Sequence, residues 1–247
     1  MNAALHITYS ALLLAIAARR NRISGTAHDF STGELTTLGI LIGDAMESAW
    51  NRPRGKNWLW PFVIQSATLT VTSGAIAPAD INYGPWISLW SADPRPESST
   101  AYRVPVRLRD SSGIYPADNL SSVFALYFNR APEFNSTAHG ATTAYAVGDV
   151  VYDATTGNCY RCKATVGASS GILLSNATYW EEMLIPREFY TYLVETVQAE
   201  YHRACGQPDT AALCDARAQE SLEQEFIAAK DGPTGSGKPW TVGGTWQ

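Results

Sequence analysis

The sequence predicts an α+β fold, in which N-terminal and C-terminal helices form a helical core that carries a small β-sheet and an inserted three-stranded β module. Two observations carry this prediction. Apolar residues recur every three or four positions near both ends of the chain, as in helices with one buried face. Between these ends they alternate in short runs bounded by turn residues, as in strands. With 247 residues, 45% of them hydrophobic, the chain can bury a sizeable core.

Two helices are predicted in the first fifty residues. Thr8 is placed to cap a helix that runs to about Arg20. Ser31 and Glu34 have the spacing of a capping box, so a second helix begins there and ends near Trp50. Its buried face is predicted to consist of the apolar residues at helical spacing, which are Leu35, Leu38, Leu41, Ile42, Ala45, Met46 and Ala49.

The middle of the chain, from Pro61 to Phe128, is predicted to form a compact sheet. The expected strands cover residues 62–71, 86–90, 103–109 and 123–128. Two connecting stretches, residues 92–100 and 110–120, are rich in Pro, Ser and Asp, so they are predicted to be surface linkers.

Three arginines are candidate DNA-facing residues. Arg103, Arg107 and Arg109 alternate with apolar residues and therefore share one face of the predicted strand. The formal net charge of −5 argues against a protein whose whole surface binds nucleic acid, because neutralising phosphates requires clustered Lys and Arg. We favour a solvated face for these arginines, with contact to DNA as the alternative.

Residues 137–182 form a bounded pattern that interrupts the surrounding sequence. Tyr145-x-x-Gly148-Asp149 is followed by Tyr152, Tyr160 and Trp180, and these residues resemble the small chitin-binding modules of the type 5/12 carbohydrate-binding class. The resemblance implies a three-stranded module whose sugar-binding members expose aromatic rings after the second strand. This chain has residues 163–166, Lys-Ala-Thr-Val, at that place. We therefore predict that the motif residues form the core of the insert, and that deleting the insert leaves the remaining core folded.

Two further helices are predicted after the insert. Pro186 begins a helix whose apolar stripe runs from Phe189 to Ala204. Asp209 is predicted to cap a last helix that ends near Lys230 and carries a thin apolar stripe of Leu213, Ala216, Leu222 and Phe226. This helix is expected to pack partly on a neighbouring subunit.

The last stretch, residues 231–247, is interpreted as an extended arm, with simple disorder as the alternative. Its tryptophans, Trp240 and Trp246, are expected to insert into a partner, and Phe226 is a third candidate for partner docking. The predicted domains are thus a core of residues 1–136 plus 183–230, the insert 137–182, and the arm 231–247.

The sequence favours a protein that is not an enzyme. Residues 232–238 match the first seven positions of a phosphate-binding loop, but Pro239 stands where the loop needs Ser or Thr to hold magnesium. Cys159 and Cys162 are three apart in a predicted strand, so their side chains point to opposite faces and favour no metal site. No catalytic residue, cofactor or metal is predicted. The apolar run at residues 11–18 is too short to span a bilayer, so no membrane segment is predicted.

Short motifs outside the insert follow one another in a recognisable order. They are Ala49-Trp50, Trp58-x-Trp60-Pro61-Phe62, Ser91-Ala-Asp93-Pro94-Arg95, Pro132-Glu-Phe134 and Tyr192-Leu193. In this order they resemble a family of tailed-bacteriophage and prophage head-to-tail connector, or neck adaptor, proteins, many of which carry a Tyr-x-x-Gly-Asp insert at the same place.

The resemblance to neck adaptors implies a structural virion protein made in the cytoplasm of the bacterial host and located in the virion neck. It implies a homo-oligomeric ring of twelve-fold symmetry that binds the portal protein and tail or neck proteins. DNA would pass through the ring without sequence-specific binding. The alternative is a carbohydrate-binding protein of a phage tail, whose insert recognises glycans on the host surface.

Overall fold

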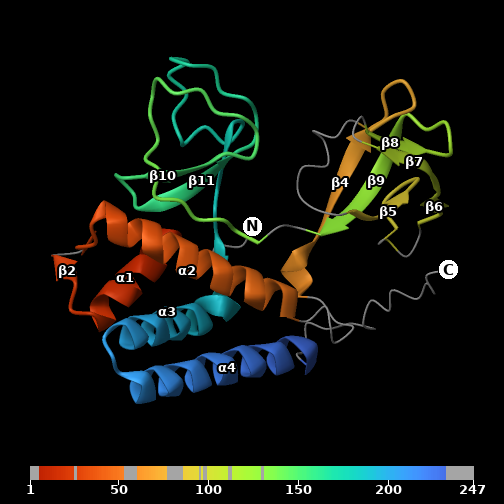
Figure 1. The fold of residues 1–247 in the computed structure, drawn as a ribbon. Coiled ribbons are helices and arrows are strands. Elements are labelled where there is room, and N and C mark those ends of the chain that lie inside the picture. Colours follow the sequence, from red (N-terminus) through yellow and green to blue (C-terminus); the bar gives the residue numbers. More distant parts are fainter. Residues whose placement is uncertain are drawn as a thin grey trace. The chain divides into compact units, whose positions relative to one another are not determined.

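The structure is a computed structural model that describes residues 6–24, 27–52, 60–76, 86–94, 96, 99–110, 113–128 and 131–231. The predicted α+β class is confirmed, with helices and several small sheets (Figure 1). The chain divides into a helical unit, Met1–Arg52 with Ala131–Gln247, and a β unit, Pro53–Arg130. Residues 53–130, which were predicted to belong to the core, form a unit of their own, and the predicted insert lies inside the helical unit.

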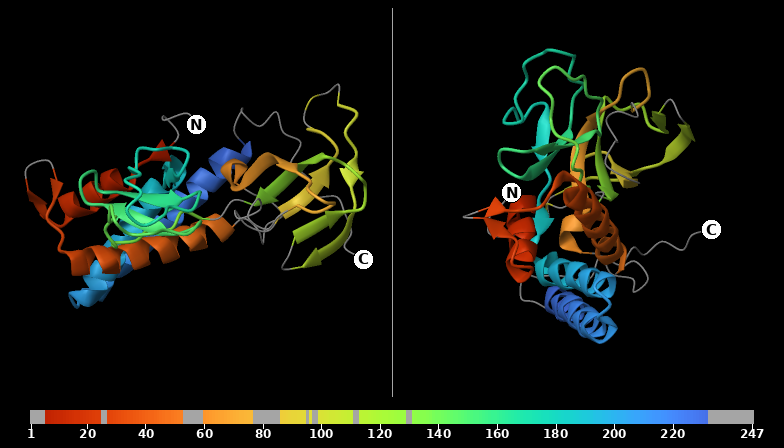
Figure 2. Two further views of the ribbon diagram at one scale, coloured as in Figure 1. Left: turned by 90° about the horizontal axis from the view of Figure 1, so that it is seen from above. Right: turned by 60° about the vertical axis from the view of Figure 1, so that its left-hand side comes forward.

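The described α-helices are α1 (Tyr9–Arg19), α2 (Thr32–Asn51), α3 (Tyr190–Ala204) and α4 (Pro208–Asp231). Helix α3 contacts each of the other three and lies between the α1–α2 pair and α4 (Figures 1 and 2). None of the described helices combines the length and the apolar character that a membrane span needs.

The predicted starts of the first two helices are confirmed. The Thr8 hydroxyl accepts a hydrogen bond from the Ala11 N–H, and Ser31 and Glu34 form both bonds of the capping box. The predicted face of α2 is buried, with Leu41 as the half-buried exception.

Two pairs of short strands lie in the helical unit, and the first of them joins parts that are distant in the sequence. Strand β1 (His6–Ile7) pairs with β13 (Ile185–Pro186), and β2 (Ile23–Ser24) pairs with β3 (Ala27–His28). None of these was predicted from the sequence. Pro186 therefore lies in a strand, and the 3₁₀ turn η5 (Arg187–Phe189) leads into α3.

The predicted three-stranded module is present. Its strands β10 (Val150–Asp153), β11 (Asn158–Cys162) and β12 (Trp180–Glu182) form one antiparallel sheet in that order. Figures 1 and 2 show the module on the side of α1 and α2 that faces away from α4. Residues 137–182 are called the module from here on.

In the β unit, the 3₁₀ turn η3 (Pro61–Val63) leads into β4 (Ile64–Thr70), which belongs to a sheet with β5 (Trp86–Trp90), β6 (Arg103–Val104) and β9 (Ser122–Phe128). The strand order is β4-β9-β5-β6, and β7 (Val106–Asp110) forms a hairpin with β8 (Gly113–Pro116). The core of the β unit consists of the buried residues Leu69, Ile76, Leu89, Val104, Ile114, Val123 and Ala125.

Two predictions for the β unit are corrected. The single strand expected at residues 103–109 is broken at Pro105, which has no N–H for a ladder and separates β6 from β7. The stretch expected to be a linker, residues 110–120, contains β8, because Ile114 is buried in the core of this unit.

Candidate functional site

The Tyr145-x-x-Gly148-Asp149 motif builds a turn that holds β11. The Asp149 carboxylate accepts a hydrogen bond from the Ala146 N–H at 2.7 Å. Gly148 has a φ of 98°, which favours glycine, and its N–H donates to the Cys162 carbonyl at 2.8 Å. The ring of Tyr145 is buried below the turn. Each motif residue therefore has a structural role within the module.

The module has a small core of its own. It consists of Tyr145, Val151, Cys162, Val166 and Trp180, with Tyr160 packed against it. The ring of Tyr145 meets the edge of Trp180 at a centroid distance of 5.2 Å. Throughout residues 137–182, all of which the structure describes, every aromatic ring is buried or half-buried. The module thus exposes no row of rings that could stack on a sugar.

Tyr152, which was predicted to lie in this core, instead faces helix α1. Tyr152 pairs across the ladder with Cys159, and both side chains are buried. Tyr9 of α1 is 1% exposed, stacks on Phe134 at 4.6 Å and meets the Tyr152 ring edge-on at 6.5 Å. We call Tyr152, Asn158 and Cys159 the docking face of the module.

Asn158 of the docking face caps helix α1. Its side-chain oxygen accepts a hydrogen bond from the Ser10 N–H at 3.0 Å, and its amide group donates to Glu182 at 2.8 Å. Gly157 precedes it with a φ of 74°, and a Cβ at this position would lie 3.1 Å from Cβ of Ser10. The turn between β10 and β11 therefore fits against the first turn of α1. Sequence reasoning missed this contact because its partners lie about 150 residues apart.

The cysteines of β11 lie on opposite faces, as predicted. Cys159 belongs to the docking face and Cys162 to the module core. Burial raises the pKa of the Cys159 thiol to about 11, and burial also raises the pKa values of Cys162 and Cys214. Cys205 is exposed. The described residues contain no group of three or more His, Cys, Asp or Glu side chains that could hold a metal ion.

We expect iodoacetamide at mildly alkaline pH to label Cys205 in the folded protein and to label the three buried cysteines only in denaturant. The reagent needs an accessible thiolate, and burial disfavours both access and ionisation. Peptide mass spectrometry measures the labelling. Because the Cys159 pKa rises from 9.0 to about 11 on folding, the unfolded chain releases its proton first. The stability contributed by this residue therefore falls as pH rises from 9 to 11. Equal labelling rates at Cys159 and Cys205 would contradict the docked module.

One ion pair links α1 to α3. Arg19 contacts Glu195 at 2.5 Å, and the Glu195 side chain is 6% exposed while that of Arg19 is 45% exposed. The second carboxylate oxygen of Glu195, Oε2, is buried without a hydrogen-bond partner in the described part of the chain. The neighbouring Arg20 donates to the Val197 carbonyl at 2.9 Å and lies over the ring of Tyr201. These contacts fix the C-terminal end of α1 against α3.

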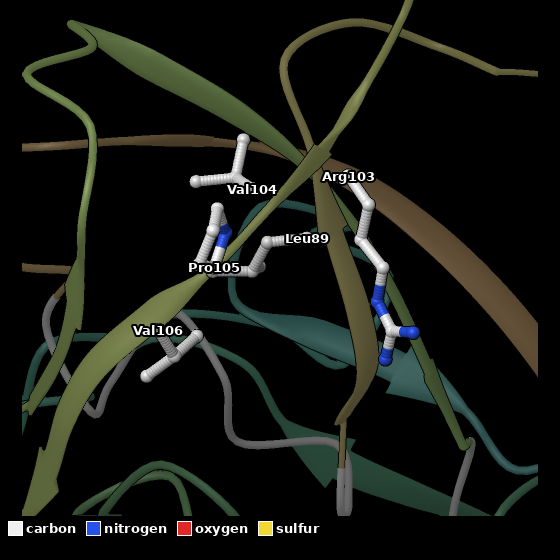
Figure 3. Close-up of a pocket in the computed structure, with 5 residues that line it drawn as sticks. All are labelled: Leu89, Arg103, Val104, Pro105 and Val106. Atoms are coloured by element: carbon white, nitrogen blue, oxygen red, sulfur yellow. The ribbon is translucent and has the colours of Figure 1, made fainter. Parts of the chain in front are cut away.

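The candidate DNA-facing arginines lie on two strands. Arg103 in β6 and Arg107 in β7 are exposed, and the side chain of Arg109 lies outside the described residues. A hollow of ≈ 370 Å³ beside Arg103 is lined by Leu89, Arg103, Val104, Pro105 and Val106. Figure 3 shows Arg103 extending away from Val104 and Val106. The hollow is therefore mostly apolar, with one cation at its side.

Helix α4 buries a different stripe from the predicted one. The buried residues are Ala211, Cys214, Ala218, Leu222 and Phe226. Leu213, expected to be buried, is 61% exposed, and Ile227 is 51% exposed. These two lie on the side of the helix opposite the buried stripe, together with Ala216, Glu220 and Gln224, and we call this set the outer face of α4.

Of the three residues predicted to dock a partner, the structure describes Phe226. Phe226 is 8% exposed and is covered within the chain itself. Trp240, Trp246 and residues 232–238, whose sequence was compared with a phosphate-binding loop, lie outside the described residues. Among the described residues of α4, the large apolar side chains that are exposed are thus Leu213 and Ile227.

No protein-family model matches this chain, and no curated protein matches its sequence.

Proposed function

We propose that the protein is a structural component of the neck of a tailed bacteriophage. In this proposal it forms a ring that joins the portal protein to tail or neck proteins and lets DNA pass. The order of motifs along nearly the whole chain supports the proposal. The structural observation that carries it is the outer face of α4, which presents two strongly exposed apolar residues on the helix that precedes Trp240 and Trp246.

Helix α4 has the properties of an element that packs between two subunits. One side is buried in its own helical unit, and the other carries Leu213 and Ile227. These residues are fourteen positions apart, which is about 21 Å along a helix. In a closed ring each subunit uses the same pair of surfaces, so even a small contact is repeated around the ring. The exposed apolar side chains would be covered by this contact.

The charge of the protein fits passage of DNA better than tight binding. A net charge of −5 repels phosphates over most of the surface. Arg103 and Arg107 are exposed and provide a local cationic contact. Few phosphate contacts give weak binding that depends on salt concentration and not on sequence.

The variant Leu213→Glu with Ile227→Glu is expected to assemble into rings on purified portal protein at least about tenfold more weakly, because charges would replace the apolar contact between neighbouring subunits. Both side chains are exposed, so the melting temperature of the monomer should change little. The measurement is co-sedimentation or electron microscopy of the mixed proteins.

Leu173→Glu is the matched control, because Leu173 is 68% exposed but lies on the module and not on α4. Its association with the portal should stay unchanged. Normal assembly of the α4 variant would contradict the proposal. Retention of the protein on chitin above a control protein would instead favour the carbohydrate-binding alternative.

A further inference from the structure

Among the described strands, β4 lies at one edge of the sheet in the β unit. It pairs with β9 over seven residues without a bulge, and no described strand pairs with its other side (Figure 1). Its sequence, Ile-Gln-Ser-Ala-Thr-Leu-Thr, contains no charged residue and no proline. Soluble proteins usually protect an edge with charges, prolines or bulges, since open N–H and C=O groups bind further strands. None of these protections occurs in β4.

The opposite edge of the same sheet is protected. Strand β6 is two residues long, carries the exposed Arg103, and is followed by Pro105. The two edge strands therefore differ in length, in the presence of a charged residue and in the presence of a neighbouring proline. This contrast indicates that the open edge at β4 has a use.

The hydrogen-bond pattern identifies which groups of β4 are open. The Val71 N–H donates to the Ser121 carbonyl at 2.9 Å, which continues the β4–β9 register. Alternate residues of an antiparallel ladder bond to the same neighbour, so odd-numbered residues of β4 bond to β9. Ser66, Thr68 and Thr70 consequently turn their N–H and C=O groups outward. Their side chains are half-buried or exposed.

We propose that β4 accepts an added strand, and that the strand is residues 240–247 of a neighbouring copy of this chain. The inference rests on the proposed ring and names one of its contacts. Residues 240–247 contain no charged side chain and no proline, and eight extended residues reach about 26 Å, enough to cover the seven of β4. Residues 232–239 separate them from the end of α4 at Asp231 and supply a tether of similar reach.

The side-chain pattern of this segment matches the two faces of β4. In an extended conformation Trp240, Val242 and Trp246 share one face, and Thr241, Thr245 and Gln247 share the other. In β4, Leu69 faces the core while Thr68 and Thr70 are exposed. An added strand can thus extend the apolar face with tryptophans and the polar face with threonines. Main-chain bonds would supply affinity, and the tryptophans would supply specificity.

Amide hydrogen exchange of the full-length chain tests the added strand directly. At concentrations that favour assembly, the amides of Ser66, Thr68 and Thr70 should exchange at least about tenfold more slowly than after dilution to monomer. The amides of Ala67 and Leu69 bond to β9, so they should be protected in both states. A synthetic peptide of residues 239–247 should slow the same three amides in the dilute protein.

Thr68→Pro removes one outward N–H without touching the bonds to β9, and Thr68→Ala is the matched control that keeps this N–H. The Pro variant should assemble about tenfold more weakly, while the Ala variant assembles normally. If the Pro variant fails to fold, amide hydrogen exchange of the unchanged chain still tests whether a strand is added to β4.

Three outcomes separate this inference from the proposed function. In the first outcome, rings bind the portal protein but the amides of Ser66, Thr68 and Thr70 exchange quickly. This result would overturn the added strand and would leave the proposed function unchanged. Protection that persists in a chain truncated after Asp231 overturns the choice of residues 240–247, because β4 then pairs with another strand, such as β4 of a second copy. Protection without any binding to portal supports the added strand and contradicts the neck adaptor.

Discussion

Deletion of residues 137–182, with the ends bridged by a short Gly-Ser linker, is expected to destabilise the helical unit instead of leaving it folded. The deletion uncovers Tyr9, which is 1% exposed, and removes the Asn158 side chain that caps α1. Burying a large side chain contributes about 2 kcal/mol, and a helix cap contributes about 1 kcal/mol. The combined loss, on the order of 3 kcal/mol, is a large part of the 5–15 kcal/mol that keeps a typical domain folded. Denaturant unfolding followed by circular dichroism measures it.

Point variants separate docking from a general effect of deletion. Tyr152→Ala removes the ring that meets Tyr9 and should lower the unfolding midpoint, while Tyr152→Phe keeps the ring and should not. Leu173→Ala, at a position 68% exposed, is the matched control within the module. A deletion protein with an unchanged midpoint would show that the docking face contributes nothing to the helical unit.

The second large effect is expected from Arg19→Met. The substitution leaves the Glu195 carboxylate, 6% exposed in its side chain, without the cation that it contacts at 2.5 Å. Removing one partner of a buried ion pair costs about 3–5 kcal/mol, and the half-exposed Arg19 reduces this to about 2 kcal/mol. The free energy of unfolding measured in urea should fall by this amount.

The exposed ion pairs of Arg203 in α3 provide the comparison. Arg203 contacts Glu200 and Asp215, and all three side chains are about two-fifths exposed. Arg203→Met should therefore cost less than about 1 kcal/mol, since solvent screens exposed pairs. The double variant Arg19→Met with Glu195→Leu should recover most of the loss, because no buried charge then remains. A double variant that is less stable than Arg19→Met would contradict this explanation.

Local signals predicted the starts of the first two helices correctly. Thr8, Ser31 and Glu34 bond to backbone groups within four residues, so the sequence alone determines their geometry. The turn of the Tyr145-x-x-Gly148-Asp149 motif is local in the same way, which explains why the module could be recognised.

Features that depend on distant partners were missed. On α4 the hydrophobicity of Leu213 favoured a buried position, but the packing against α3 buries Cys214 and leaves Leu213 exposed. Tyr152 and Tyr160 look equivalent in the sequence, and only the position of α1 places the first on the docking face. Strand β8 is short and lies in a stretch rich in turn residues, so its pairing with β7 could not be predicted from composition.

Helix α1 depends on residues that are synthesised much later, because β1 pairs with β13 and Asn158 caps α1. The first helix leaves the ribosome early, but its cap follows about 150 residues later and the partner of β1 later still. The β unit is continuous in sequence, from Pro53 to Arg130, and all its partners emerge together. Domains generally fold as units while the chain is being made. The residues of the β unit are therefore all synthesised while α1 and α2 still wait for α3, so α1, although it is made first, reaches these native contacts only after the β unit can fold.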